Sequence, residues 1–241
     1  EVLGASFRVY IGVKGDKIIK KYQHRIPRKS EGYFLKIEKD CIVIAGADER
    51  GAYYGVQTLA QLLALDKLPL AEVTDYPDVP YRGVVEGFYG APWSQEACIR
   101  QLDFYGRNKM NVYIYGPKDD PYHRTPNWRK PYPAREGEEL KVLVNRAKEN
   151  NVIFYWAIHP GQDIRWNEED RSLLLQKFES MYQLGVRGFA VFFDDISGEG
   201  TKADKQAELL NYIDDHFVKV KRDVAPLILC PTEYNLSLIH I

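Results

Sequence analysis

Cysteine is scarce in this 241-residue chain, which has only three cysteines, and methionine is scarcer still, with two. The cysteines stand far apart, at Cys41, Cys98 and Cys230, and no Cys-x-x-Cys spacing occurs. This spacing excludes a zinc knuckle and a thioredoxin-type redox motif. We therefore expect the three residues to be buried thiols of the core.

An excess of charge of one sign is also missing, because 33 basic side chains face 34 acidic ones, for a formal net charge of -1. Such a balance provides neither the excess positive charge that attracts nucleic acid nor a polybasic surface for a membrane. No apolar run approaches the ~20 residues that a membrane-spanning helix needs. Non-specific binding of polyanions is excluded as the main activity. The chain begins at Glu1 without a signal-type segment, so the sequence itself does not indicate a compartment.

The first third of the chain predicts a small α+β domain. Runs rich in β-branched residues at 2–13 and 32–47 predict strands, and the spacing of apolar residues over 48–65 predicts a helix capped by Asp48. Between Pro69 and Pro80 the prolines are expected to interrupt both helix and sheet. We place a domain boundary near Asp78, which gives an N-terminal domain at 1–77.

From Tyr81 onward, short apolar runs alternate with amphipathic stretches, a pattern typical of βα units around a parallel sheet. Helices are expected at 94–108, 136–150, 168–184 and 203–219. Strands are expected near Val84, Val112, Ile153, Phe189 and Leu227. No Gly-x-Gly-x-x-Gly follows the first strand, and polar residues follow every strand, which favours a barrel over a doubly wound sheet. The sequence thus predicts a partial (β/α)8 TIM barrel of about five βα units at 78–235.

The strongest local feature is an apolar strand that ends in two adjacent carboxylates, Asp194 and Asp195. Neighbouring charges repel, so one carboxyl can be held protonated beside an ionised one, which suits a general acid next to an orienting anion. A metal-ligand pair and a helix N-cap before Thr201 are the alternatives. Adjacent residues fit neither the ~5 Å nor the ~6.5–9.5 Å separation of two-carboxylate glycosidases, and fit better a reaction in which the substrate's own acetamido group attacks.

Other strand ends carry further candidates. Gly87 would let a ligand approach the backbone, although a simple βα turn with core aromatics explains its segment equally well. Lys118 can donate to sugar hydroxyls, although its segment taken alone is typical of a solvated loop. Tyr234 could hydrogen-bond a reacting group, with Glu233 and Asn235 as weaker candidates.

One further strand end suggests a metal site, because His159 and Asp163 could face one ion. The five histidines are scattered, however, and no second clustered histidine supports this hypothesis. We expect His159 to be a hydrogen-bonded residue in the wall of the site.

Five ordered segments, 86–93, 115–122, 156–161, 193–198 and 230–235, resemble the successive strand-end motifs of glycoside hydrolase family 84. This is the O-GlcNAcase family, whose bacterial members were formerly called hyaluronidases. Segment 46–59 is similar to the domain that precedes the barrel in bacterial members. The resemblance extends over essentially 1–235.

The resemblance implies a retaining β-N-acetylglucosaminidase that works through an oxazoline intermediate, without metal or other cofactor. Asp194 would orient the 2-acetamido group, Asp195 would be the general acid and then the general base, and Tyr234 would hydrogen-bond the acetamido or oxazoline group. Gly87, through its backbone, and Lys118 would hold sugar hydroxyls. The implied partner is a glycoprotein or glycan that carries N-acetylglucosamine, and no nucleic-acid or membrane partner is implied. The resemblance does not indicate the oligomeric state. Bacterial members also imply an extracellular or periplasmic location.

The sequence departs from the family after the fifth motif, where members continue into further strands. Residues 236–241 do not resemble that continuation, and we expect a truncated reading frame or a non-native tail. Two alternatives therefore stay open. The chain could be a sugar-binding fragment without turnover, or a hexosaminidase of another substrate-assisted family, although those enzymes typically pair Asp with Glu.

Overall fold

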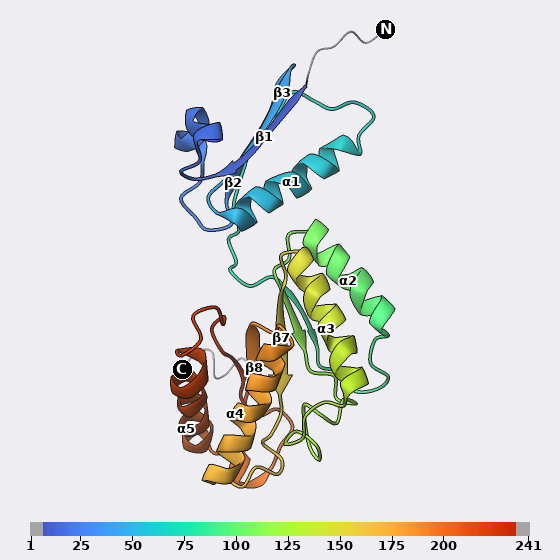
Figure 1. The fold of residues 1–241 in the computed structure, drawn as a ribbon, viewed down its shortest axis with the longest axis vertical. Helices are drawn as coiled ribbons and strands as arrows, with labels where there is room; N and C mark the ends of the chain where they lie inside the picture. Colours follow the sequence, from blue (N-terminus) through green and yellow to red (C-terminus); the bar gives the residue numbers. More distant parts are fainter. Residues whose placement is uncertain (1–6, 235–241) are drawn as a thin grey trace. The chain divides into compact units, whose positions relative to one another are not determined.

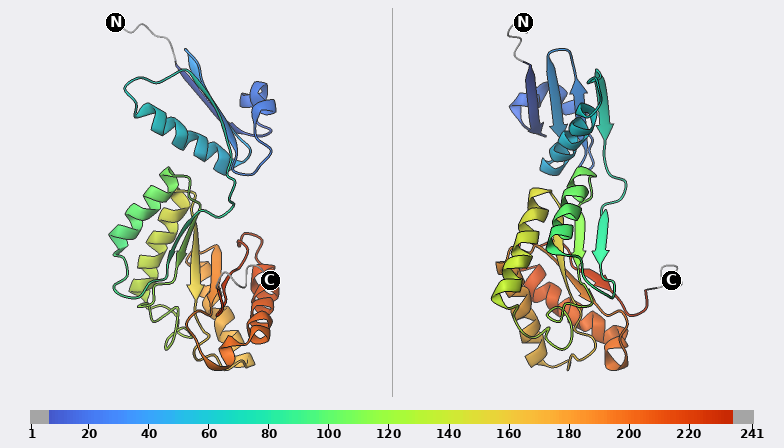
Figure 2. Two further views of the ribbon diagram at one scale, coloured as in Figure 1. Left: turned by 180° about the vertical axis from the view of Figure 1, so that it is seen from behind. Right: turned by 90° about the vertical axis from the view of Figure 1, so that its right-hand side faces the viewer.

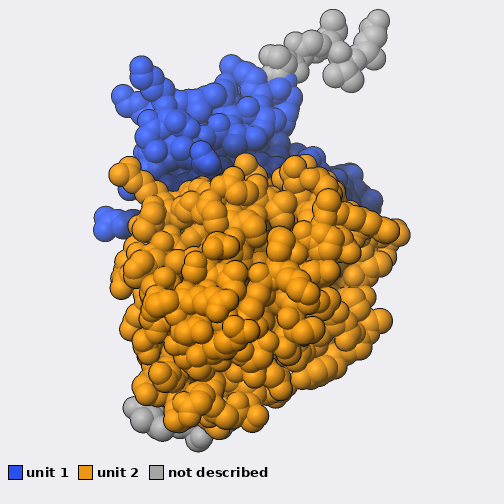
Figure 3. Space-filling model, turned by 60° about the horizontal axis from the view of Figure 1, so that its bottom comes forward, with its two compact units in different colours: residues 1–82, 106–110 blue, residues 83–105, 111–241 orange. Residues whose placement is uncertain are grey.

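The computed structural model describes residues 7–234, and its contacts divide the chain into two compact units. The first unit comprises 1–82 and 106–110, and the second comprises 83–105 and 111–241 (Figure 3). The domain limits 1–77 and 78–235 stay predictions, and the expected tail at 236–241 lies outside the described residues. Within the described part, no helix has the length and apolar character needed to cross a bilayer.

The first unit is a four-stranded sheet in the order β1-β3-β2-β4, covered on both faces (Figures 1 and 2). The strands are β1 (Arg8–Val13), β2 (Tyr33–Ile37), β3 (Cys41–Gly46) and β4 (Ala71–Asp75). Helix α1 (Glu49–Leu63) packs with Leu35 and Ile44, whereas the next residues along the strands, Phe34 and Val43, pack with Ile19 of the 3-10 helix η1 (Lys17–Arg25). The predicted strands and the predicted helix are thus confirmed within the described residues, while positions 2–6 of the first predicted run lie outside them. The 3-10 helix η1 was not predicted.

Strand β4 (Ala71–Asp75) corrects the expectation that the prolines exclude a sheet. The prolines flank β4 at Pro69 and Pro77, so its five residues keep every N–H that pairing with β2 requires. Because β4 lies at the edge of the sheet, only one of its sides needs a partner.

Asp48 caps α1 as predicted, and replacing it by Ala is expected to destabilise the first unit. Its carboxylate accepts hydrogen bonds from the backbone N–H groups of Gly51 (2.8 Å) and Glu31 (2.9 Å) and from the Ser30 hydroxyl (2.7 Å). Loss of such a cap costs about 1 kcal/mol of unfolding free energy, measurable by urea denaturation. Asp66→Ala, at an exposed aspartate beyond the same helix, is the control. Equal stability of the two variants would show that the cap contributes nothing.

This effect should depend on pH. Burial raises the pKa of Asp48, but the hydrogen bonds from Glu31, Ser30 and Gly51 outweigh burial and hold the pKa below its ordinary value. A depressed carboxyl pKa stabilises the fold above the ordinary value, and the contribution is lost as the pH falls through the folded-state pKa. The difference between the wild type and Asp48→Ala should therefore shrink below about pH 4.

The second unit is a five-stranded, all-parallel sheet whose strands follow the chain order β5-β6-β7-β8-β9. The strands are β5 (Gly83–Glu86), β6 (Val112–Tyr115), β7 (Ile153–Ile158), β8 (Gly188–Phe192) and β9 (Ile228–Cys230). The helices between them are α2 (Gln95–Arg107), α3 (Ala134–Glu149), α4 (Glu168–Gln183) and α5 (Ala203–Ile213), the last followed by a π-helical turn at Asp214–Val218. A doubly wound sheet would reverse its strand order, and this sheet does not. The predicted partial barrel with about five βα units is therefore confirmed (Figure 1).

The two faces of this sheet carry different side chains. Phe189 of β8 faces the helices, with its ring centroid 4.9 Å from that of Phe178 in α4 and 4.9 Å from that of Phe217. The opposite face carries Ala157 and Ala190, which pack with Phe192, Ile114, Ile228 and Cys230. Helices packed on one face of a parallel sheet, with the strand side chains packed against one another on the other face, are the arrangement of a barrel wall.

The cysteines only partly match the expectation of buried thiols. Cys98 is buried, whereas Cys41 and Cys230 are half-buried. Cys230 is less covered because it lies on the inner face of β9, an edge strand of the described sheet.

Candidate active site

The carboxyl ends of the parallel strands meet at one edge of the second unit's sheet, and the predicted site residues lie there. Gly87 follows β5, Lys118 follows β6, His159 follows β7, and Asp194 and Asp195 follow β8, while Tyr234 follows β9. This is the end at which barrel enzymes carry their active sites.

Asp194 is held by two buried basic side chains. Lys118, whose side chain is 3% exposed, forms an ion pair and hydrogen bond with Asp194 Oδ2. The alternative of a solvated loop is thus wrong for Lys118, because its ammonium group is paired inside the unit. The Oδ1 atom of Asp194 is buried and makes no hydrogen bond within the described part of the chain. This oxygen lies 3.5 Å from His159 Nε2. A cation on one oxygen and an acceptor without a hydrogen bond on the other fit a carboxylate that receives an N–H group from a ligand.

His159 supports Asp194 from the neighbouring strand. Its Nε2 lies 2.7 Å from the backbone carbonyl oxygen of Asp194, and because a carbonyl only accepts, this nitrogen carries the proton. Burial lowers the pKa of His159 below its ordinary value, which keeps the ring neutral. The prediction of a hydrogen-bonded wall residue is confirmed.

Asp163, which the sequence also allowed to share an ion with His159, has other partners in the structure. Asp163 accepts instead from Trp128 Nε1 at 2.7 Å and from Arg129 Nη1 at 2.8 Å. Among the described residues, three ligand atoms within 4.8 Å of one another occur only at Glu38, Asp40 and Cys41, which belong to the first unit. Exposed acidic groups of this kind are common without a metal.

Asp195 has a different environment from its neighbour. Its φ of 54° lies in the left-handed region, which costs a non-glycine residue of order 1 kcal/mol and is found at functional sites. Asp195 is exposed, and its Oδ2 accepts a hydrogen bond from the Tyr89 hydroxyl at 3.3 Å. The alternative of a helix cap is wrong, since Ser197 is the N-cap of the next helical turn. One carboxylate is therefore paired with a cation, and the other faces solvent.

Tyr234 and Gly87 lie at the two ends of this row of strand ends. Tyr234 is 61% exposed, and the charges of Asp195 and then Asp194 raise its pKa, so it lies near both carboxylates. Gly87 is half-buried at the end of β5. Glu233 is exposed, and Asn235 lies outside the described residues. The roles assigned to Tyr234 and Gly87 stay predictions.

Two residues of the first motif were not singled out from the sequence. Tyr89 is 64% exposed and contacts Asp195, so the expectation that this segment holds core aromatics is wrong for it. Glu86 is 1% exposed and accepts from the backbone N–H of Trp93 at 3.0 Å, which ties together the two ends of the loop that carries Gly87 and Tyr89. A carboxylate at the end of an apolar strand was the available signal for Glu86.

The comparisons with known proteins divide the chain in the same way. Residues 82–238 match the beta-N-acetylglucosaminidase family, and residues 14–76 match domain 2 of glycosyl hydrolase family 20. The protein O-GlcNAcase of Rattus norvegicus is 37% identical over 158 residues, which cover 63% of this chain and 17% of that protein.

Solved structures are similar over more of the chain. CpGH84B superposes with a TM-score of 0.82 at 47% identity, covering 86% of this chain and 37% of that one. CpGH84D superposes with a TM-score of 0.82 at 31% identity, covering 95% of this chain and 40% of that one. The chain thus spans well under half the length of each of these relatives.

Proposed function

Because this chain belongs to the beta-N-acetylglucosaminidase family, glycoside hydrolase family 84, we propose that it removes β-linked N-acetylglucosamine from glycoproteins or glycosides with retention of configuration. The observation that carries the proposal is the contrast between two adjacent carboxylates, Asp194 paired with buried Lys118 and Asp195 exposed beside Tyr89. The two groups can then have different tasks in one reaction.

In the first step, Asp194 accepts the N–H of the 2-acetamido group at its unused oxygen. The acetamido carbonyl oxygen attacks the anomeric carbon, the bond from this carbon to the leaving oxygen breaks, and Asp195 gives its proton to that oxygen. The nitrogen's developing positive charge is stabilised by Asp194, which forms an ion pair with Lys118.

In the second step, water adds to the anomeric carbon while Asp195 takes its proton, and the bond from the oxazoline oxygen to that carbon breaks. Two displacements on one carbon retain the configuration, and Asp195 is again protonated. Tyr234 is proposed to hydrogen-bond the reacting group. Lys118 has three donors and one is spent on Asp194, so it can also donate to a sugar hydroxyl together with the backbone at Gly87.

The test is hydrolysis of an aryl N-acetyl-β-glucosaminide by the 241-residue chain, beside a longer chain that completes eight βα units. We expect turnover of this substrate and none of the matching aryl β-glucoside, because the glucoside lacks the attacking acetamido group. Equal turnover of both substrates, or turnover by neither chain, would contradict the proposal.

The described sheet holds five parallel strands, whereas a complete barrel has eight. This difference favours a second candidate function, sugar binding without turnover. In that case only the longer chain would turn over, while the 241-residue chain would still bind a stable oxazoline mimic.

A further inference from the structure

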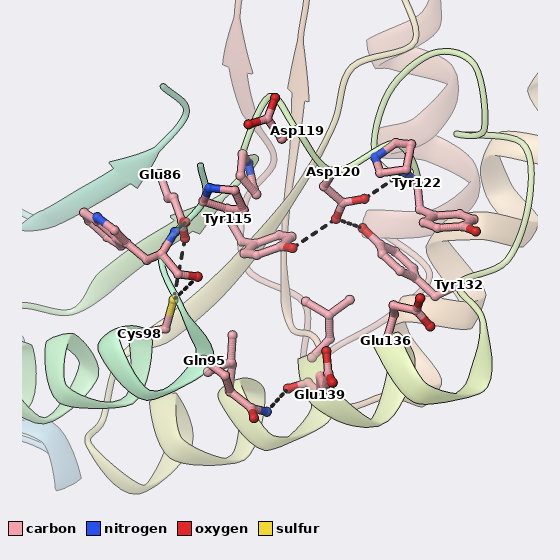
Figure 4. A pocket seen from close by; sticks show the side chains of 16 residues that line it. Glu86, Gln95, Cys98, Tyr115, Asp119, Asp120, Tyr122, Tyr132, Glu136 and Glu139 are labelled. Carbon is pink, nitrogen blue, oxygen red and sulfur yellow. Dashed lines mark hydrogen bonds between the residues drawn. The ribbon is translucent and has the colours of Figure 1, made fainter. Parts of the chain in front are cut away.

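A cavity of about 370 Å³ lies in the second unit, between the start of α2, the start of α3 and the loop after β6 (Figure 4). This volume falls within the ~300–1,000 Å³ of small-molecule pockets. The residues that line it are Glu86, Pro92, Trp93, Gln95, Cys98, Tyr115, Pro117, Asp119, Asp120, Pro121, Tyr122, Tyr132, Glu136, Glu139, Leu140 and Leu143. Asp194, Asp195 and Tyr234, on which the proposed reaction depends, are not among them.

The polar lining of this cavity accepts hydrogen bonds and offers few donors. Five of the sixteen lining residues are acidic, and none is Lys, Arg or His. The hydroxyls of Tyr115 (3.0 Å) and Tyr132 (2.7 Å) both donate to Asp120 Oδ2, and the Tyr132 oxygen also accepts from Trp156 Nε1 at 3.0 Å, so neither phenol has a proton to donate to a ligand. Burial, followed by the charge of Asp120, raises the pKa of both phenols and keeps these protons in place. The amide of Gln95 donates to the backbone carbonyl of Glu139 at 3.1 Å. With five carboxylates in the lining, the cavity favours a polar ligand that brings donors of its own.

Within residues 7–234, only one of the five acidic lining residues, Glu139, has an ion-pair partner. Its Oε1 lies 3.0 Å from Arg135 Nε. Glu86 and Asp120 accept hydrogen bonds, whereas Asp119 and Glu136, which are both exposed, have neither an ion-pair nor a hydrogen-bond partner among the described residues. Figure 4 shows Glu136 at the start of α3, next to Tyr132. Aromatic faces near an unpaired carboxylate attract cations, because the ring quadrupole and the negative charge act together.

The remaining lining is apolar. Leu140 and Leu143 of α3 lie with Pro92 and Pro121 around the aromatic rings. Such a surface favours a ligand with a hydrocarbon body over a hydrated metal ion, and the carboxylates disfavour anions.

We propose that this cavity is a second binding site, specific for a small organic ammonium ion with an apolar body, whose charged end lies at Glu136 and whose body packs against the aromatic rings and Leu143. The site is separate from the strand-end site, and the proposal does not depend on glycosidase activity.

The experiment is calorimetric or NMR titration of the 241-residue chain at pH 7 with 2-phenylethylammonium and with 2-phenylethanol, which has nearly the same shape but no charge. We expect the ammonium ion to bind about tenfold more tightly, as a cation–carboxylate contact supported by rings implies. Glu136→Gln should remove most of that advantage and leave binding of the alcohol unchanged.

The matched control is Glu138→Gln, the same change on the same helix at a residue that is also exposed but does not line this cavity. Its affinity for the ammonium ion should equal that of the wild type. The proposal is overturned if the alcohol binds as tightly as the ammonium ion, if Glu136→Gln and Glu138→Gln behave alike, or if neither compound binds.

Discussion

Replacing Asp195 by Asn is expected to lower kcat about 10²- to 10⁴-fold on glycosides with poor leaving groups, which is the usual contribution of a general acid. An alkoxide leaves slowly unless it is protonated, whereas a nitrophenolate leaves without help. The measurement is therefore kcat as a function of the leaving group's pKa, made on whichever chain length turns over. The variant should show a steep dependence and the wild type a shallow one.

Glu199→Gln is the matched control for this prediction, because Glu199 is an exposed carboxylate of the same strand-end loop, paired with Lys202. It should leave the profile unchanged. A shallow profile for Asp195→Asn would assign the acid to another residue.

The barrel units could be predicted from the sequence because their signals are local. Each strand shows a short apolar run and each helix repeats apolar residues at three- and four-residue intervals, and the structure places both within a few residues of the predicted limits. The cap at Asp48 is local in the same sense, since Gly51 lies three residues away.

What the sequence could not predict depends on residues that are far apart in the chain. Lys118 lies in a polar, proline-containing segment that is typical of a solvated loop, yet it pairs with Asp194, 76 residues further on. Tyr89 reaches Asp195 across 106 residues. No periodicity records such pairs, so the burial of Lys118 and the contact of Tyr89 appear only in the folded chain.

The two units also explain why a hexosaminidase of another family was a reasonable alternative. The first unit matches domain 2 of glycosyl hydrolase family 20, whereas the barrel matches the beta-N-acetylglucosaminidase family. The strand ends that carry the candidate chemistry, including Asp194 and Asp195, belong to the barrel. The family is therefore decided by the second unit.

Replacing Asp194 by Asn is expected to lower kcat about 10²- to 10³-fold even on nitrophenyl substrates, which need no acid, because the charge opposite the developing oxazolinium would be lost. Protein stability should fall as well. Lys118 is 3% exposed in its side chain, and the variant would leave its ammonium group buried without a counter-charge.

The double variant Lys118→Met with Asp194→Asn separates these two effects. Removing both charges should restore much of the stability, because no buried ion is then left unpaired. Activity should stay low, because the acetamido group still lacks its anion. Recovery of kcat in the double variant, measured on folded protein, would mean that Asp194 supports the fold alone and that another group orients the acetamido nitrogen.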